Sequence, residues 1–78
     1  MYKIKKSNQF TEWLLRLKDL RAKAKIEVRL VQTELGNLGD SKSVGEGVFE
    51  MRINYGPGYR LYFANENGEI IFFAYRWR

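Results

Sequence analysis

Arg52, Arg60 and Tyr62 stand at alternating positions in two segments whose other positions are mostly apolar. Because successive side chains of a β-strand point to opposite faces of a sheet, we expect all three on the face that the apolar core leaves open. Guanidinium groups grip phosphate through paired hydrogen bonds, and a phenol can stack on a base. The pattern therefore predicts a platform for RNA. Arginine there can also stabilise the charge of a scissile phosphate while the RNA's own 2′-hydroxyl attacks it.

A second interpretation of the same residues is purely structural. Arg52 can pair with Glu50 or a neighbouring acid as an ordinary cross-strand charge, and Tyr62 can serve as amphipathic packing. Spacing alone favours this second interpretation.

A basic row at helical spacing lies earlier in the chain. Its members are Lys18, Arg21, Lys25 and Arg29. The row is either an anion-binding face or a solvated helix face that acidic neighbours partly neutralise. The whole chain carries 14 Lys and Arg against 9 Asp and Glu, a net charge of +5. This excess indicates an anionic partner, although it also serves solubility.

The chain has no cysteine and no histidine. It therefore has no disulfide, no thiolate nucleophile, no imidazole catalyst and no metal held by Cys or His, and we expect neither a metal site nor a cofactor. The lack of cysteine fits a reducing cytoplasm. No stretch approaches a membrane span, and the N-terminus lacks the apolar core of a signal peptide. We expect a cytoplasmic protein with no membrane partner.

The N-terminal half has the periodicity of two helices behind a short strand, Tyr2–Lys5. Ser7 is a suitable N-cap for the first helix, and Asp19 for the second. The first helix should bury a stripe at i, i+3, i+4 and i+7, made of Phe10, Trp13, Leu14 and Leu17. The second should bury Leu20, Ala24, Val28, Val31 and Leu35 and end at Gly36. Their short connection predicts an antiparallel helical hairpin.

The C-terminal half changes to a period of two. Gly36–Gly47 is rich in glycine and serine and is predicted to be a loop. Three strands are expected after it, Val48–Tyr55, Tyr59–Ala64 and Glu69–Tyr75, with tight turns between them. The order β-α-α-β-β-β predicts one α+β domain over residues 1–78, with the helical hairpin on one face of a mainly antiparallel sheet.

Residues 36–63 read GNLGDSKSVGEGVFEMRINYGPGYRLYF and resemble the addiction-module killer proteins of the RelE/HigB toxin superfamily. The specific part is the ungapped pattern G-x-G-[VF]-x-E-x-R-I-x-x-G-P-G-Y-R-[LV]-Y-[FY]. The resemblance extends over residues 1–71. The ParE branch of the superfamily, whose target is gyrase, matches the Gly58-Tyr59-Arg60 segment less well.

This resemblance implies a RelE-like fold and a small cytosolic bacterial toxin that is encoded beside an antitoxin. Family members typically act as mRNA interferases, endoribonucleases that cut messenger RNA in the ribosomal A site. The antitoxin, the ribosome and mRNA are then the partners. By the same resemblance Arg52 and especially Arg60 contact the phosphate, while Arg21, Lys25 and Arg29 face ribosomal RNA.

The C-terminus departs from the family. Relatives continue into a Gly-Gly-Asp-Lys-Ser type of segment and a final short helix that completes the active site, and this sequence lacks that helix. In one hypothesis Tyr75, Arg76 and Arg78 replace the missing groups, with Tyr75 as a stacking or proton-handling phenol. In the other, a truncation leaves a silent fold that only binds RNA or antitoxin. The aromatic tail also suggests a homo-oligomer that pairs through the C-terminal strand.

Overall fold

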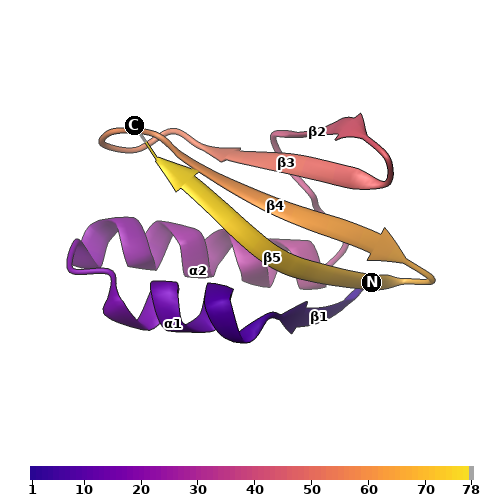
Figure 1. The fold of residues 1–78 in the computed structure, drawn as a ribbon, viewed down its shortest axis with the longest axis horizontal. Coiled ribbons are helices and arrows are strands. Elements are labelled where there is room, and N and C mark those ends of the chain that lie inside the picture. Colours follow the sequence, from indigo (N-terminus) through magenta and orange to yellow (C-terminus); the bar gives the residue numbers. More distant parts are fainter. Residues whose placement is uncertain (78) are drawn as a thin grey trace.

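Two helices cover one face of a five-stranded sheet in the computed structural model, which describes residues 1–77 (Figure 1). The elements are β1 (Lys3–Lys6), α1 (Asn8–Arg16), α2 (Leu20–Glu34), β2 (Ser41–Gly45), β3 (Val48–Ile53), β4 (Tyr59–Glu66) and β5 (Glu69–Trp77). The strand order is β1-β5-β4-β3-β2. Only the β1–β5 pair is parallel, so the prediction of an α+β, mainly antiparallel fold is confirmed.

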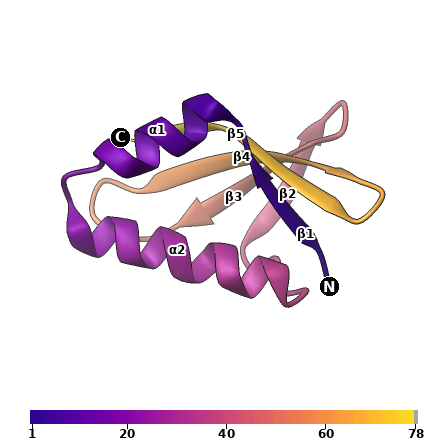
Figure 2. The same ribbon diagram turned by 90° about the horizontal axis from the view of Figure 1, so that it is seen from below.

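Both helices begin where their caps predict. The Ser7 hydroxyl accepts a hydrogen bond from the Phe10 amide at 3.1 Å, and Asp19 Oδ1 accepts from the amides of Arg21 and Ala22. Each cap satisfies amides of the first turn that have no partner within the helix. The short connection makes the expected hairpin, and Figure 2 shows both helices lying across the same face of the sheet.

Helix α1 packs on β5 through aromatic rings. The Phe10 and Phe72 ring centroids are 5.6 Å apart, and the Trp13 ring stacks on Tyr75 with centroids 4.2 Å apart and planes 7° from parallel. Phe10, Trp13 and Leu14 are buried as predicted. These contacts fix α1 beneath the last strand.

Helix α2 buries a different stripe from the predicted one. The predicted core residues are exposed, and the helix instead buries Ala22, Ile26, Leu30 and Thr33. The helix has apolar side chains on two opposite sides, so periodicity alone does not select one of them. Each side has one alanine, Ala22 or Ala24, so a small residue does not select the side either; the shape of the sheet does. On the buried side the Thr33 hydroxyl donates to the Arg29 carbonyl at 2.8 Å.

The predicted loop over residues 36–47 contains a strand. Strand β2 pairs antiparallel with β3, and Ser41 lies opposite Met51. Glycine and serine form strands poorly by themselves, and the hydrogen bonds to β3 are what make this segment a strand. A tight turn with positive φ at Glu46 and Gly47 reverses the chain into β3.

Strands β3 and β4 have the predicted phase. Met51 lies opposite Leu61 and both are fully buried beneath the helices, whereas the next pair, Arg52 and Arg60, faces the other way. The core therefore lies between this face of the sheet and the helical hairpin.

Strand β5 contains one extra residue. Phe63 pairs with Phe72 and Tyr62 with Ala74, so Phe73 is bulged out of the ladder. After the bulge the alternation of inward and outward side chains is reversed, so odd-numbered residues such as Tyr75 take the face that Ile70 and Phe72 take before it. The outer edge of β5 is covered by β1 along Glu69–Phe72. The aromatic tail, through which a homo-oligomer is expected, follows this stretch, and pairing through it stays a prediction.

We predict that two identical substitutions on α2 differ sharply in cost. Leu30 is 5% exposed and Leu20 is 74% exposed. Leu30→Ala should lower the free energy of unfolding by roughly 2–4 kcal/mol because it leaves a cavity. Leu20→Ala should change it by less than about 0.5 kcal/mol. Urea denaturation of both variants measures the difference, and equal losses would show that α2 is turned the other way.

Candidate nucleic-acid interface

Three arginines form a row across the face of the sheet that the helices leave open. Arg52 on β3 lies opposite Arg60 on β4, and Arg60 lies opposite Arg76 on β5. Directly opposed residues of antiparallel strands have Cα atoms about 4.5–5.5 Å apart. The structure thus brings Arg52 and Arg60 together as the sequence predicts, and it adds Arg76 to them. We call these residues the arginine row.

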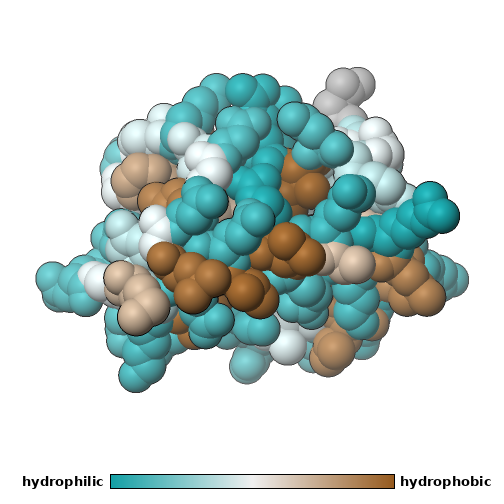
Figure 3. All heavy atoms as spheres, turned by 180° about the vertical axis from the view of Figure 1, so that it is seen from behind, coloured by the Kyte–Doolittle hydropathy of each residue, from teal (hydrophilic) through white to brown (hydrophobic). Residues whose placement is uncertain are grey.

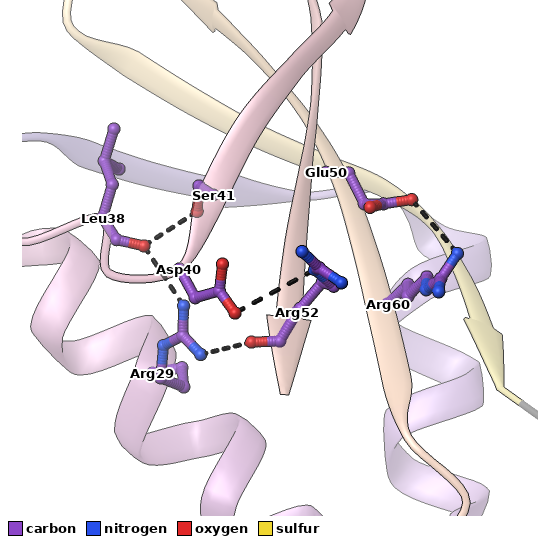
Figure 4. Close-up of polar contacts among 7 residues, drawn as sticks. All are labelled: Arg29, Leu38, Asp40, Ser41, Glu50, Arg52 and Arg60. Carbon is purple, nitrogen blue, oxygen red and sulfur yellow. Dashed lines mark hydrogen bonds and ion pairs between the residues drawn. The ribbon is translucent and has the colours of Figure 1, made fainter. Parts of the chain in front are cut away.

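Two carboxylates hold this row together. Like charges in direct opposition destabilise a sheet, so the row needs counter-charge. The Glu50 side chain is only 9% exposed, and its Oε2 lies 3.7 Å from Arg60 Nη1 (Figure 4). The Tyr62 hydroxyl donates to the same oxygen at 3.1 Å. Asp40 Oδ2 lies 4.0 Å from Arg52 Nε. Arg52 therefore pairs with a neighbouring acid, Asp40, as the structural interpretation allows, and Glu50 pairs with Arg60 instead.

Arg29 has a structural role that the basic row does not reveal. Its Nη1 donates to the Arg52 carbonyl at 2.6 Å and its Nη2 to the Leu38 carbonyl at 3.2 Å (Figure 4). Burial lowers the pKa of the Arg29 guanidinium, and the charge of Asp40 opposes that shift. A Cβ on Gly39, whose φ is +63°, would lie 2.8 Å from Nη2, so glycine makes room for the guanidinium. Arg29 therefore ties α2 to β3 and the loop.

The rest of the basic row is accessible. Lys18, Arg21 and Lys25 are exposed, and Lys25 Nζ lies 5.6 Å from the centroid of the Tyr55 ring. Arg21 and Lys25 on α2, together with Lys18 in the connection just before it, form a basic flank beside the end of the sheet. We keep the term basic flank for them, because Arg29 is turned inward.

The two predicted site tyrosines, Tyr62 and Tyr75, lie on opposite faces of the sheet. Tyr62 stands on the open face beside the arginine row, with its hydroxyl bonded to Glu50. Tyr75 lies on the helix-covered face, stacked on Trp13, and so it points away from Arg76. The hypothesis that Tyr75 joins the arginines at one site is therefore contradicted, because the Phe73 bulge sets Tyr75 inward. Arg78 lies outside the described residues.

A hollow of about 110 Å³ adjoins the row where β3 turns into β4. Arg52 and Arg60 line it together with Pro57 and Gly58 of the turn. Two forked guanidiniums at a small hollow suit a phosphate group of an RNA chain. Within residues 1–77, no group of three acidic, His or Cys side chains is placed to hold a metal ion. None of the helices in this part of the chain is long and apolar enough to cross a membrane.

A protein of Haemophilus influenzae, described as uncharacterized, is 52% identical to this chain over 68 residues. The alignment covers 87% of the chain and 69% of the relative. The chain belongs to the same family as this protein. No protein-family model matches the chain, and no solved structure matches it either. This family member has no stated activity, so we infer function from the residues of the open face.

Glu50 is the residue of this face whose importance the sequence alone does not reveal. Alternation places it on the open face, but its burial and its two polar contacts depend on neighbouring strands. The like-charged pair Arg52 and Arg60 could have indicated Glu50, because two adjacent cations require an acid nearby.

We predict that Glu50→Gln lowers the free energy of unfolding by roughly 1–3 kcal/mol, because a buried charge-assisted contact is lost and the arginine row keeps its repulsion. Glu69→Gln is the matched control, since Glu69 pairs with Lys5 at 3.4 Å in a more exposed position. The control should lose less than about 1 kcal/mol. Thermal unfolding at low and high salt measures both, and equal losses would mean that Glu50 is an ordinary surface acid.

Proposed function

We propose that the chain is the toxin of a type II toxin-antitoxin module and acts as a ribosome-dependent mRNA endoribonuclease with a RelE-like fold. The observation that carries the proposal is the arginine row on the uncovered face of the sheet. Two of its three members, Arg52 and Arg60, are those that the resemblance to RelE/HigB toxins assigns to the phosphate.

The chemistry that these side chains support is cleavage by the RNA's own 2′-hydroxyl. As the 2′-oxygen bonds to phosphorus and the bond to the 5′-oxygen breaks, negative charge accumulates on the phosphoryl oxygens. Arg52 and Arg60 can hold that charge from fixed positions, because Asp40 and Glu50 already orient their guanidinium groups. The 2′-hydroxyl gives up its proton in this step and the leaving 5′-oxygen takes one up, and Glu50 and Tyr62 are the groups beside Arg60 that can exchange these protons.

A site without histidine depends strongly on having its substrate aligned by another molecule. A ribosome that holds mRNA in its A site supplies this alignment. The basic flank, Lys18, Arg21 and Lys25, is accessible and suits contacts with ribosomal RNA. Arg29 is excluded from that role here, since its guanidinium is bonded to main-chain carbonyls. A cognate antitoxin and a cytoplasmic location complete the proposal.

A second candidate function is binding without cleavage. The inward position of Tyr75 favours it, because the phenol that was expected among the arginines is stacked on Trp13. Such a protein would still hold RNA or antitoxin on the open face. Loss of cleavage with retained binding would identify this case.

We predict that Arg60→Lys lowers RNA cleavage by about a hundred- to a thousand-fold, because lysine keeps the charge but loses the fork that fixes it at the phosphate. Arg16→Lys on α1 is the control and should leave cleavage unchanged. Each variant is expressed in a bacterium, and growth and primer extension on ribosome-bound mRNA are measured. The unsubstituted chain should arrest growth with cuts at A-site codons.

Other outcomes of the same experiment reject the proposal. Arrest with DNA damage and no RNA cuts would indicate gyrase as the target. Absence of arrest, with antitoxin binding retained, would indicate the binding module. A large drop in the thermal stability of Arg60→Lys would place Arg60 in the structure rather than in catalysis.

We predict that Arg21→Glu with Lys25→Glu weakens ribosome association. The slope of log affinity against log salt should become shallower by about 1.5 units, because two phosphate contacts are lost. Sedimentation with purified ribosomes at several salt concentrations gives the slope. If affinity and slope both stay the same, the basic flank is only a solvated surface.

A further inference from the structure

Helix α2 presents an apolar stripe that its own fold leaves uncovered. The stripe consists of Leu20, Ala24, Val28, Val31 and Leu35, which are all exposed. Leu20 is 74%, Val28 54% and Leu35 68% exposed. Steps of four, four, three and four residues place them on one side of the helix, opposite the buried stripe. Figure 3 shows apolar side chains gathered in a band among hydrophilic ones, at the height where Figure 1 places α2.

A groove runs beside the stripe, between α2 and the end of β3. Its volume is about 450 Å³, and its apolar walls are Ala24, Val28 and Ile53. The groove exists because β2 does not extend along the last residues of β3. The Arg52 amide donates to the Asp40 carbonyl, and the ladder between β2 and β3 begins only at Ser41. The outer side of β3 beyond Arg52 is therefore left without a neighbouring strand.

Positive charge surrounds the groove on this side. Lys25, Arg29 and Arg52 line it, and the one acid among the described lining residues, Asp40, is already paired with Arg52. The far flank of the stripe carries both signs of charge, with Glu27 and Glu34 beside Lys6 and Lys23. The excess of positive charge therefore lies on the side next to the groove.

We propose that the stripe and groove together bind an acidic amphipathic helix from a protein partner. The stripe covers fifteen residue steps, or about 22 Å of helix, which is the length of roughly four turns. A partner helix of that length can place apolar residues at i, i+3, i+4 and i+7 on the stripe, and carboxylates toward Arg21, Lys25 and Arg52.

Other occupants fit this surface less well. A small molecule would fill the groove and leave the stripe in water. RNA would gain little, because the stripe has no aromatic residue for a base to stack on. A second copy of the chain brings another net charge of +5 to a surface that is already basic.

This inference goes beyond RNA cleavage and stands if the cleavage proposal fails. Where both hold, the partner helix covers Lys25 and Arg21, which the proposed function assigns to ribosomal RNA. Binding of the partner and of the ribosome then exclude each other.

The test is selection of helical peptides from a display library, with randomised surface positions, against the whole chain without RNA or ribosomes. The selected peptides should have net negative charge and an apolar i, i+3, i+4, i+7 pattern. Their affinity, measured by fluorescence anisotropy, should fall at least tenfold with Val28→Glu and with Lys25→Glu. Val44→Glu is the matched control, because Val44 is 49% exposed on β2, and it should leave the affinity within twofold.

Several results would overturn the proposal. Selected peptides that are basic or not amphipathic would do so, as would selection that yields no binder. Equal losses with Val28→Glu and Val44→Glu would place the binding elsewhere. If sedimentation shows a dimer that Val28→Glu dissociates, the stripe is an interface between copies of the chain. Circular dichroism verifies that each variant is folded, which is expected because the substituted side chains are exposed.

Discussion

The antiparallel register of β3 and β4 is the constraint on which the rest of the molecule depends. Met51 opposite Leu61 places one set of side chains beneath the helices, and this pairing necessarily sets Arg52 opposite Arg60 on the other face. A slip of one residue would drive guanidinium groups into the core. The burial that holds the sheet to its helices therefore also concentrates positive charge on the open face, and the two cannot be separated.

The repulsion produced by this register is offset by carboxylates from two parts of the chain. Glu50 stands two residues before Arg52 on the same strand, and Asp40 comes from the loop before β2. Arg29 reaches over from α2 and adds a further positive charge, and it holds the main chain of β3 and of the loop that carries Asp40. The main chain at Arg52 is therefore tied to α2, which favours binding of an anion with little rearrangement.

Local signals in the sequence predicted much of this architecture. Ser7 and Asp19 mark helix starts because a side-chain oxygen next to free amides is a short-range interaction. Features that depend on contacts between distant parts of the chain could not be predicted from the sequence. Helix α2 is apolar on two sides, and only the shape of the sheet selects Ile26 over Val28. Strand β2 forms because β3 offers it a ladder, and Glu50 is buried by neighbours from β4. The arginine row could be predicted for β3 and β4, where alternation is clear, but not for β5, where residues 70–75 are all apolar or aromatic.

The extra residue in β5 determines what the last strand presents to each side. If Phe73 entered the ladder without a bulge, the alternation that buries Ile70 and Phe72 would continue, and Arg76 would be directed at the aromatic core while Tyr75 emerged among the guanidinium groups. Deletion of Phe73 would have no such effect, because the remaining residues would alternate regularly with Tyr75 inward and Arg76 outward, as they are now. The bulge therefore lets the strand carry one residue more than its partner and still present a cation, not a phenol, on the outer surface.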